Sequence, residues 1–505
     1  MKTTLYQSKL TDRLSKNSSS TPILYTNKNT ISTAELLEKS QSLSAELYKK
    51  GMRKDDRVVI AARPGIDFLI IVYANMFLCT KIAIIDPEMG KDNYINKLKQ
   101  WDPKWAFVDS LLLLISNNKL IRNLYLKLKP TAFYFPVWST INYILTGVKT
   151  ASKHMHISQL KQAEKHKFEQ KRIDEHDFIV VYTSGTTSIP KAVLHSFNSL
   201  DSSFQHMVDL LGDPKDQRIA AHLPHFMLMG VNARIPVFMW NYDWSAKKKF
   251  DFIDKNGITT LFGPPADYLE WMHYCDKKNR KFPKSITHII IGSAPIFKAF
   301  LENLVKYLDD KVRITCFYGM TENLFISYID GREKINYACQ GDPLGKPLKG
   351  VDIKFEADGE LMVHSDQLFS RYYHLEKRPK FHSSGDLATI DTNGMLIMTG
   401  RKKDMILRKH MNIYPGLYEP TIMKIEGVVA VAMVGRYSDE KADEEVYLFV
   451  ESSQKYTEPA FMKLISQGEY SIDREALPDY IIFSELPRKG RQNKIDKKAL
   501  QNQIK

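Results

Sequence analysis

The chain has 505 residues, of which 43% are hydrophobic and 26% charged, a composition that excludes collagen-like, low-complexity and wholly disordered proteins. A single hydrophobic core rarely grows beyond about 250–300 residues, so this length predicts at least two domains. The 72 lysine and arginine residues exceed the 58 acidic ones, which gives a formal net charge of +14. No zinc finger, RNP-like aromatic pattern or arginine-rich tail accompanies this charge, so we expect no nucleic-acid partner and predict no oligomeric state.

The first third of the chain alternates short β-branched runs with helical patterns. The predicted strands are Arg57–Ala62, Lys81–Asp86 and Trp105–Asp109, and the helices between them are Ile66–Thr80 and Lys91–Gln100. Further strands are predicted at Phe178–Tyr182, Thr259–Phe262, His288–Gly292 and Arg313–Phe317. Strands alternating with helices favour parallel sheets with covered faces, and ligands bind at the carboxyl ends of such strands.

The pattern changes after about residue 340. Short strands separated by turn residues follow, at Asp352–Phe355, Glu360–His364, Leu387–Ile390 and Met395–Thr399, which predicts a small antiparallel, β-barrel-like subdomain. The charged, glycine-led segment Gly400–Asp404 is a candidate hinge, and the last hundred residues again alternate helix and strand. We therefore predict an α/β fold, with a large N-terminal domain of parallel and mixed sheets flanked by helices over residues 1–400. A small, mobile α+β domain is predicted over residues 401–505.

Cysteines and apolar runs bear on the compartment. Cys79, Cys275, Cys316 and Cys339 include no CxxC pair, so we expect neither a disulfide scaffold nor a structural zinc site, but small buried side chains in a reducing compartment. The N-terminus lacks the apolar core of a secretory signal, and the apolar stretch Phe68–Thr80 is shorter than the roughly 20 residues that cross a bilayer. A cytoplasmic location is expected.

A second apolar stretch, Pro130–Val148, carries no charge and is followed by basic residues. Two interpretations stay open. The aromatic segment Phe133–Tyr143 is either part of a buried hairpin or helix, which we favour, or a segment that rests on a lipid surface or lines an acyl entrance. Aromatic rings suit the lipid interface, and lysines attract anionic head groups.

A loop rich in glycine and hydroxyl groups, Tyr182–Lys191 (YTSGTTSIPK), follows a predicted strand. Its backbone N–H groups and hydroxyls suit phosphate oxygens, and its lysine can neutralise their charge. The spacing does not match the GxxxxGK[ST] pattern of P-loop nucleotidases.

Together with this loop, five further motifs resemble the adenylate-forming superfamily, which contains acyl-CoA synthetases, luciferases and the adenylation domains of peptide synthetases. They follow in the family's order: Tyr318–Glu322 (YGMTE), Ser384–Asp386 (SGD), Gly400–Ile406 (GRKKDMI), Asn412–Pro415 (NIYP) and Leu486–Leu500 (LPRKGRQNKIDKKAL). The segment that contains Glu35–Leu36 also resembles the opening helix of this family, so the resemblance extends over nearly the whole chain.

The resemblance implies a two-step reaction. A carboxylate attacks the α-phosphate of ATP, which gives an acyl-adenylate and pyrophosphate, and the acyl group then passes to a thiol after the small domain rotates. Attack of one anion on another requires cations and dipoles around the developing charge. By resemblance, Lys494 bridges the carboxylate and the α-phosphate, Thr321 touches that phosphate, and Glu322 binds Mg²⁺ through oxygen.

The remaining roles are implied in the same way. Tyr318 packs on adenine beside Gly319, Asp386 accepts hydrogen bonds from the ribose with help from Arg401, and Lys403 is the hinge residue. The implied phosphate-binding residues are Thr183, Ser184, Gly185, Thr186, Thr187 and Lys191. The expected acyl pocket comprises Met227, Gly230, Gly263, Gly292, Ser293 and Ala294. Plain structural alternatives are surface lysines for Lys494 and Lys403, and a turn-capping role for Asp386.

Two departures from the family pattern concern the phosphate loop and the molecule that accepts the acyl group. Ser188 replaces the usual glycine of the phosphate loop, and Lys409–His410 stand where thioester-forming relatives commonly carry two glycines. Residues 57–108 also partly resemble the olefin-biosynthesis branch, whose members form a β-lactone without coenzyme A. The leading prediction is an acid–CoA ligase for an apolar, fatty carboxylic acid. The alternatives are adenylation without coenzyme A, such as β-lactone synthesis from a 3-hydroxy fatty acid, and a weakly catalytic membrane-associated binding protein.

Overall fold

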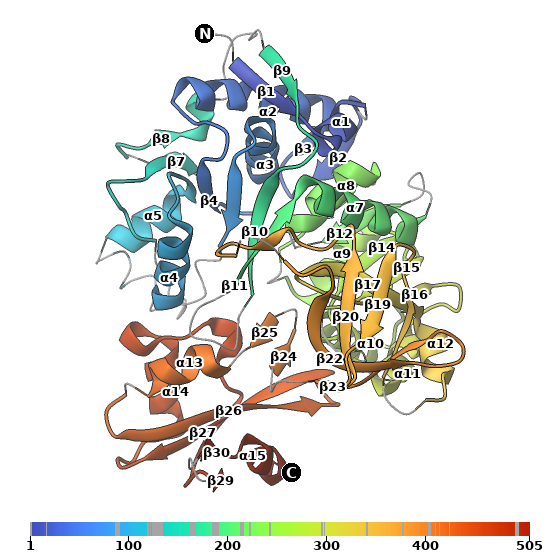
Figure 1. The fold of residues 1–505 in the computed structure, drawn as a ribbon. Helices are drawn as coiled ribbons and strands as arrows, with labels where there is room; N and C mark the ends of the chain where they lie inside the picture. The colour runs from blue at the N-terminus through green and yellow to red at the C-terminus, as the bar shows by residue number, and fades with distance from the viewer. Residues whose placement is uncertain are drawn as a thin grey trace.

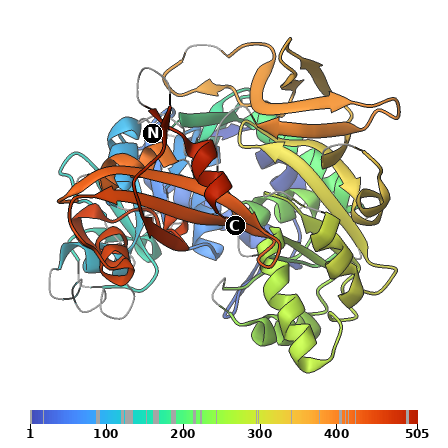
Figure 2. The same ribbon diagram turned by 90° about the horizontal axis from the view of Figure 1, so that it is seen from below.

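The fold is described from a computed structural model of the full chain (Figure 1). The following residues lie outside the part that the structure describes: 1–2, 17, 86–90, 119–120, 122, 124–134, 151, 161–167, 184–190, 213–216, 222–223, 242–243, 294–295, 297, 340–341, 376–377, 402–405, 410, 414, 424, 490–493 and 505. The chain forms a large, sheet-rich N-terminal domain and a smaller C-terminal domain that lies against one end of it, as Figures 1 and 2 show. The predicted α/β fold class is confirmed.

A first sheet contains most strands predicted in the first third of the chain. Its strand order is β21 (Arg371–Tyr372), β11 (Lys191–Ser196), β10 (Asp177–Thr183), β5 (Lys81–Ile84), β4 (Arg57–Ala61), β6 (Trp105–Asp109), β7 (Asn142–Thr146) and β8 (Met155–His156). The strands from β10 to β8 are parallel, whereas β11 runs antiparallel to both β10 and β21. The β10–β11 hairpin therefore brings the segment around Lys191 to this end of the sheet.

A second, mixed sheet carries the later motifs. Its order is β19 (Val351–Phe355), β20 (Glu360–Ser365), β22 (His382–Ile390), β23 (Leu396–Arg401), β18 (Asp342–Pro347), β17 (Asn323–Asp330), β16 (Arg313–Met320), β15 (His288–Ile291), β14 (Thr260–Gly263), β12 (Ile219–Ala221), β13 (Val237–Met239), β2 (Pro22–Tyr25) and β3 (Thr30–Ser32). The small antiparallel unit predicted after residue 340 is present, and β18 joins it to the sheet by pairing with β17.

Helices fill the space between the two sheets and cover their outer faces. The central core contains α1 (Lys9–Lys16), α2 (Thr33–Lys49), α3 (Ile66–Leu78), α7 (Phe197–Leu211) and α8 (Pro224–Ala233). The period of two along a strand explains the layering, because Val58 and Ile60 face this core while Val59 and Ala61 face the outer one. Every side chain of α3 from Phe68 to Leu78 is buried, since the helix is sandwiched between layers and needs no polar face.

Two further layers complete the large domain. On the outer face of the first sheet lie α4 (Lys91–Trp101) and α5 (Ser110–Asn117). The outer face of the second sheet is covered by α9 (Ala246–Asn256), α10 (Pro265–Lys278) and α11 (Lys298–Leu304), with α12 (Gly331–Asn336) beside α11. A separate pair, β1 (Thr3–Gln7) and β9 (Phe168–Arg172), joins the N-terminus to the middle of the chain.

The small domain is built on a sheet of β26 (Val428–Ser438), β27 (Asp443–Ser452) and β28 (Tyr480–Phe483). Its core is completed by α13 (Pro415–Ile422), α14 (Glu458–Ser466) and the hairpin of β24 (Ile406–Arg408) and β25 (Met411–Ile413). The end of the chain adds the β29 (Arg488–Lys489) and β30 (Lys494–Ile495) hairpin and α15 (Lys497–Gln503).

Three local predictions can be checked directly. The opening helix is α2, where Ser32 and Glu35 form a reciprocal capping box. Cys79, Cys275 and Cys316 are buried free thiols, as expected, whereas Cys339 is partly exposed. None of the described helices is long and apolar enough to cross a membrane.

The uncharged stretch is largely interior where the structure describes it. Phe135 and Tyr143 pack in the core of the first sheet, and β7 pairs in parallel with β6. Phe133 lies outside the described residues. Phe135 and Tyr143 are thus covered by protein, but Tyr143 lies in β7 and Phe135 in the irregular segment before it, rather than in the hairpin or helix that we expected.

Candidate functional site

The two described ends of the phosphate-loop segment, Thr183 and Lys191, face each other in the β10–β11 hairpin. Thr183 pairs with Lys191 in the ladder, so the ends of the loop are adjacent, and Ser184, Gly185, Thr186, Thr187 and Ser188 lie outside the described residues. The Lys191 ammonium lies 5.0 Å from the centre of the Tyr372 ring, a cation–π distance. The hairpin thus places a cation at the edge of the first sheet.

The YGMTE segment forms the tight turn between β16 and β17. A Cβ on Gly319 would overlap the carbonyl oxygen of Leu324, so only glycine allows the two strands to approach this closely. The carbonyl of Thr321 accepts a 2.8 Å hydrogen bond from Nε2 of buried His195, which stands on β11. The turn is therefore tied to the strand that follows the phosphate loop.

The Glu322 carboxylate is oriented by neighbours from other segments. It is 13% exposed, and Tyr372 donates its hydroxyl to Oε1 at 2.8 Å. His382 Nε2 lies 4.0 Å from the same oxygen, and burial lowers the pKa of His382 more than the charge of Glu322 raises it. The Glu322 backbone is held as well, because its carbonyl accepts from the Phe369 N–H at 2.8 Å.

A resident metal centre built only from protein ligands is not found among the described residues, where no three His, Cys, Asp or Glu side chains gather. One carboxylate nevertheless fits Mg²⁺, which in phosphate chemistry is usually held by one or two carboxylates together with substrate oxygens. The donor set around Glu322 is compatible with that mode.

The adenine and ribose motifs meet directly. The Tyr318 hydroxyl donates a 2.6 Å hydrogen bond to Oδ2 of Asp386, and the two residues are only 9% and 8% exposed. Arg401 stands opposite Asp386 in the β22–β23 ladder. Ser384 Oγ accepts from the Asp386 N–H at 3.1 Å and fixes the turn. The sequence placed these residues in one site but gave no sign of the tyrosine–aspartate bond.

The acyl-pocket candidates come from neighbouring elements. Gly292, which follows β15, donates its N–H to the carbonyl of Gly263 at the end of β14 at 3.4 Å. A Cβ on Gly292 would overlap the Phe317 ring, and one on Gly263 would lie 2.9 Å from Asp267 Oδ2. Ser293 has a left-handed backbone with φ of 66°, and Ala294 lies outside the described residues.

The α8 candidates face the core instead. Met227 is 1% exposed in the central core, and a Cβ on Gly230 would overlap the Val237 side chain, so both are packed by protein. Three aromatic rings that sequence reasoning missed connect α8 to the strand ends: Phe226 and Phe262 are 4.2 Å apart, and Phe262 and Phe317 are 5.5 Å apart. The region is apolar and closely packed.

Lys409, the residue that replaces a glycine, adopts a glycine-like conformation with φ of 54°. Its N–H donates to both carboxylate oxygens of Asp443 at 2.8 and 2.9 Å, and its ammonium lies 3.3 Å from Glu475. Burial raises the pKa of Asp443 to about 6. Burial also raises the pKa of Asp267, on α10 of the large domain, to about 6, and nearby Lys249 and Lys409 partly counteract that rise.

The remaining candidates of the small domain are Lys494, Lys403 and His410. Lys494 opens β30 and pairs with Lys489 in the terminal hairpin. Lys403 and His410 lie outside the described residues.

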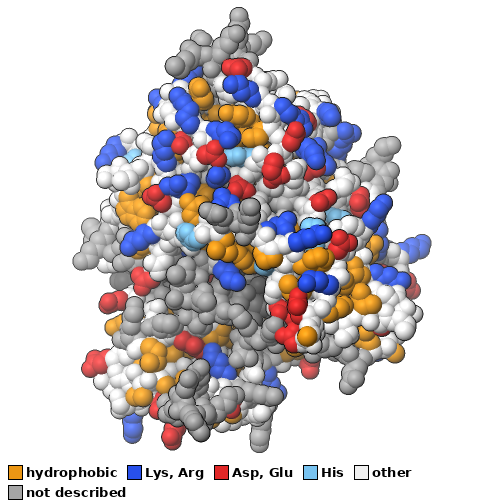
Figure 3. Space-filling model, in the orientation of Figure 1, with side chains coloured by type: hydrophobic (Ala, Val, Ile, Leu, Met, Phe, Trp, Pro, Cys, Tyr) orange, Lys and Arg blue, Asp and Glu red, His pale blue; other side chains and the backbone are white. Residues whose placement is uncertain are grey.

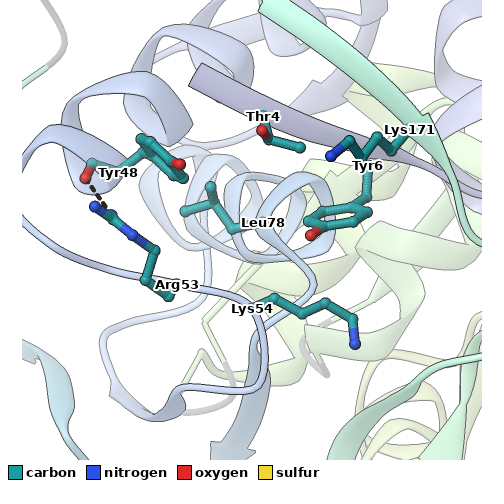
Figure 4. A pocket seen from close by; sticks show the side chains of 7 residues that line it. All are labelled: Thr4, Tyr6, Tyr48, Arg53, Lys54, Leu78 and Lys171. Atoms are coloured by element: carbon teal, nitrogen blue, oxygen red, sulfur yellow. Dashed lines mark hydrogen bonds between the residues drawn. The ribbon is translucent and has the colours of Figure 1, made fainter. Parts of the chain in front are cut away.

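A cavity of about 190 Å³ is lined by residues from β1, α2, α3, β9 and the segment after α2 (Figure 4). Its lining residues are Thr4, Tyr6, Tyr48, Arg53, Lys54, Leu78 and Lys171. The Arg53 guanidinium stacks 4.0 Å from the centre of the Tyr48 ring and donates to the Tyr48 carbonyl. None of the sequence-predicted site residues that the structure describes lines this cavity.

The fold and the ordered motifs define an enzyme that binds AMP, and comparison with known proteins agrees. Residues 11–373 match the AMP-binding enzyme family model, so the chain belongs to that family, and the predicted membership of the adenylate-forming superfamily is confirmed. A 2-succinylbenzoate–CoA ligase of Bacillus cereus is 21% identical over 93% of this chain and 92% of its own length. Relatives of this kind are CoA ligases, in agreement with the predicted acid–thiol ligase.

Solved structures share the fold over nearly the full length. A double mutant of o-succinylbenzoate CoA synthetase (MenE) from Bacillus subtilis, bound to the product analogue OSB-NCoA, gives a TM-score of 0.78 at 19% identity and covers 99% of this chain and 98% of its own. The acyl-adenylate complex of that synthetase gives 0.63 at 20% identity, over 99% and 98%. The amide bond synthetase McbA from Marinactinospora thermotolerans gives 0.78 at 15% identity, over 98% and 99%.

Proposed function

We propose that the protein activates an apolar, fatty carboxylic acid with ATP to an acyl-adenylate, releases pyrophosphate, and transfers the acyl group to coenzyme A. The observation that carries the proposal is the convergence of Lys191, Glu322 and Asp386 at the adjoining ends of the two sheets, in a chain that belongs to the AMP-binding enzymes. Activation of a carboxylate by ATP requires a cation near the phosphates, an oxygen ligand for Mg²⁺ and an acceptor for the ribose hydroxyls.

Each residue has a defined task in this proposal. The phosphate loop and Lys191 hold the β- and γ-phosphates, Glu322 binds Mg²⁺ together with phosphate oxygens, and Asp386 fixes the ribose. Mg²⁺ supplies charge neutralisation at the phosphates when it is bound. Lys494 contacts the carboxylate and the α-phosphate during adenylation, and the segment around Lys403 is the hinge between residues 1–400 and 401–505.

The apolar packing around the strand ends supports an apolar acid. Phe226, Phe262 and Phe317 form a continuous aromatic group beside Gly263 and Gly292. Such a wall offers dispersion contacts but few hydrogen-bond partners. A hydrocarbon tail needs no hydrogen-bond partners, so its transfer from water to this wall is favourable in free energy. We propose that the acyl chain extends from the Gly292 segment along these rings.

The position of the small domain supports transfer to a thiol. The chain superposes better on the product-analogue complex of the Bacillus subtilis synthetase, at a TM-score of 0.78, than on its acyl-adenylate complex, at 0.63. The charge of Lys409 acts on the pKa of Asp267 in α10, and its ammonium is directed to Glu475 of its own domain. Because its ammonium is held by Glu475, the side chain of Lys409 can leave room for a pantetheine arm beside its glycine-like backbone.

A second candidate is adenylation without coenzyme A, such as β-lactone formation from a 3-hydroxy fatty acid. It is favoured by the Lys409–His410 substitution, and the equal TM-score of 0.78 with an amide bond synthetase supports it as well. In this case the adenylate is consumed by an oxygen or nitrogen nucleophile other than a thiol.

One experiment distinguishes these proposals. Fatty, 3-hydroxy fatty and aryl acids are incubated with ATP and Mg²⁺, pyrophosphate release is measured with and without coenzyme A, and the products are identified by mass spectrometry. Acyl-CoA from a fatty acid supports the leading proposal, and a cyclic product from 3-hydroxy acids alone supports the second. Absence of pyrophosphate release with every acid would overturn both.

We also propose that the enzyme works in the cytoplasm and touches anionic membranes. A groove of about 330 Å³ lies between α5 and the segment that follows β7, with Leu114 and Val137 39% and 41% exposed beside Lys153 and His154. Figure 3 shows hydrophobic side chains over α5 at the edge of a face where basic and acidic groups are otherwise interspersed. Binding to anionic vesicles at low salt is expected, and absence of co-sedimentation would remove this contact.

A further inference from the structure

Tyr372 stands on β21, a two-residue edge strand of the first sheet, at the boundary between the two sheets. The strand β21 pairs antiparallel with β11, so that Tyr372 lies opposite Val193. Backbone bonds on both sides hold it there, from Ser370 N–H to the Leu194 carbonyl at 2.7 Å and from Tyr373 N–H to the Ala192 carbonyl at 2.9 Å. The backbone of Tyr372 is therefore fixed relative to β11.

The segment is also anchored by charge. Arg371 donates from Nε and Nη2 to Asp177 Oδ2 at 3.2 and 3.1 Å, and this pair joins β21 to the start of β10. The ring of Phe369 packs 4.8 Å from that of Tyr372. A two-residue strand would be weak alone, but these contacts prevent it from shifting.

The Tyr372 side chain contacts both charged candidates at once. Its hydroxyl donates to Glu322 Oε1 at 2.8 Å, and Lys191 lies 5.0 Å from its ring centre. His382 Nε2 lies 3.5 Å from the same hydroxyl. One side chain thus touches a residue from the phosphate-loop hairpin and a residue from the magnesium motif, which are 131 positions apart in the printed sequence, from 191 to 322.

We infer that Tyr372 is a positioning residue that holds the Glu322 carboxylate for Mg²⁺ and keeps the Lys191 ammonium beside it. This inference rests on the proposed function. A hydrogen bond to Oε1 restricts rotation of the carboxylate and leaves Oε2 available to the metal. Because a phenol is neutral, it orients the carboxylate and leaves intact the negative charge that attracts the cation. An arginine or lysine in the same place would neutralise that charge.

The ring has a separate task. A cation above an aromatic face is attracted by its quadrupole, and this attraction holds the Lys191 ammonium above the Tyr372 ring, whose hydroxyl contacts Glu322. Tyr372 therefore contacts both charged groups at once and holds them in place.

Two substitutions separate these tasks. Tyr372→Phe removes only the hydroxyl and keeps the ring, and Tyr372→Leu removes both. Tyr373→Phe is the matched control, because Tyr373 is the next residue on the same segment and packs against Trp101. All variants are compared by melting temperature before their activity is measured, so that a folding defect is recognised.

The readout is the Mg²⁺ concentration that gives half-maximal pyrophosphate release. Tyr372→Phe is expected to raise it by about ten- to a hundredfold, which corresponds to the loss of one hydrogen bond to a charged group, with little change in the KM for ATP. Tyr372→Leu is expected to raise the KM for ATP as well, because Lys191 loses its ring contact. In the Glu322→Gln background, Tyr372→Phe should add no further shift.

The outcomes separate this inference from the proposed function. If Glu322→Gln changes the Mg²⁺ dependence but folded Tyr372→Phe does not, the positioning role is wrong and the proposed function stands. If neither changes it, the magnesium role of Glu322 fails and the inference fails with it. If Tyr372→Phe does not fold, the Mg²⁺ dependence of Tyr372→Leu is compared with that of Tyr373→Phe. Equal Mg²⁺ dependence of these two variants would also overturn the positioning role.

Discussion

Removal of the Tyr318 hydroxyl tests whether the adenine and ribose motifs act as one unit. Tyr318→Phe keeps the ring and its packing in the core of the antiparallel strands, where it contacts residues such as Ile326 and Leu344. The change deletes the 2.6 Å hydrogen bond to Asp386. Asp386 then keeps its charge in a largely buried place with one donor fewer.

The magnitude follows from burial. A hydrogen bond to a charged group contributes about 1.5–3 kcal/mol, and water can replace the lost donor only where it has access. Since both residues are less than 10% exposed, at 9% and 8%, we expect the free energy of unfolding to fall by about 1.5–3 kcal/mol. The KM for ATP should rise, because Asp386 can turn away from the ribose.

Urea denaturation and ATP saturation curves measure the two effects. Tyr328→Phe is the control, because it removes a hydroxyl from β17 at a residue that is 46% exposed. A double-mutant cycle with Asp386→Asn should return a coupling energy of similar size. A loss below about 0.5 kcal/mol, together with an unchanged KM for ATP, would refute the reasoning.

Four other outcomes are expected. Lys494→Ala should abolish pyrophosphate release while the melting temperature stays unchanged, and full release by a folded variant would remove Lys494 from the reaction. Gly292→Ala should lower the free energy of unfolding by about 1–3 kcal/mol, because its Cβ overlaps the Phe317 ring; wild-type melting behaviour would contradict that packing. Asp443 has a pKa raised by burial from 3.8 to about 6, so its contribution to stability is present below pH 4 and lost as the pH rises through 6. The stability of wild type relative to Asp443→Asn should therefore fall between pH 4 and 7, and thermal melts that stay parallel across that range would count against it. Replacement of both Lys409 and His410 by glycine should change acyl transfer to coenzyme A but not pyrophosphate release. An equal effect on both steps, measured by product analysis, would show that the loop does not act in the transfer step alone.

Local patterns predicted the strands of the first sheet well, because a short run of adjacent β-branched and apolar residues is enough to specify each strand. Trp105–Asp109 is a strand with the predicted bounds, and Arg57–Ala61 ends one residue earlier than expected. The pairing of β1 with β9 and of β21 with β11 was not predicted. Those ladders join segments far apart in the chain, and nothing in either segment specifies its partner.

The candidate site shows the same division. The ordered motifs pointed to Glu322 and Asp386, whose roles remain proposals, but Tyr372 and His195 went unnoticed. One tyrosine among 25 carries no pattern of its own, and a lone histidine on a strand has the sequence appearance of a core residue. Their importance comes from contacts to Glu322 and Thr321 that only the folded chain creates.

The burial of α3 on all sides has a consequence for biosynthesis. Its apolar residues Phe68–Leu78 share a core with β12–β15, which the ribosome adds about 150 to 220 residues later at roughly 5–20 residues per second. The nascent chain therefore exposes part of the apolar surface of α3 for on the order of ten seconds or more. During this time α2 and the first sheet can cover the helix on only part of its circumference. A polypeptide with such a helix depends on chaperones during synthesis more than its final structure suggests, and expression at lower temperature with added chaperone should raise the soluble yield.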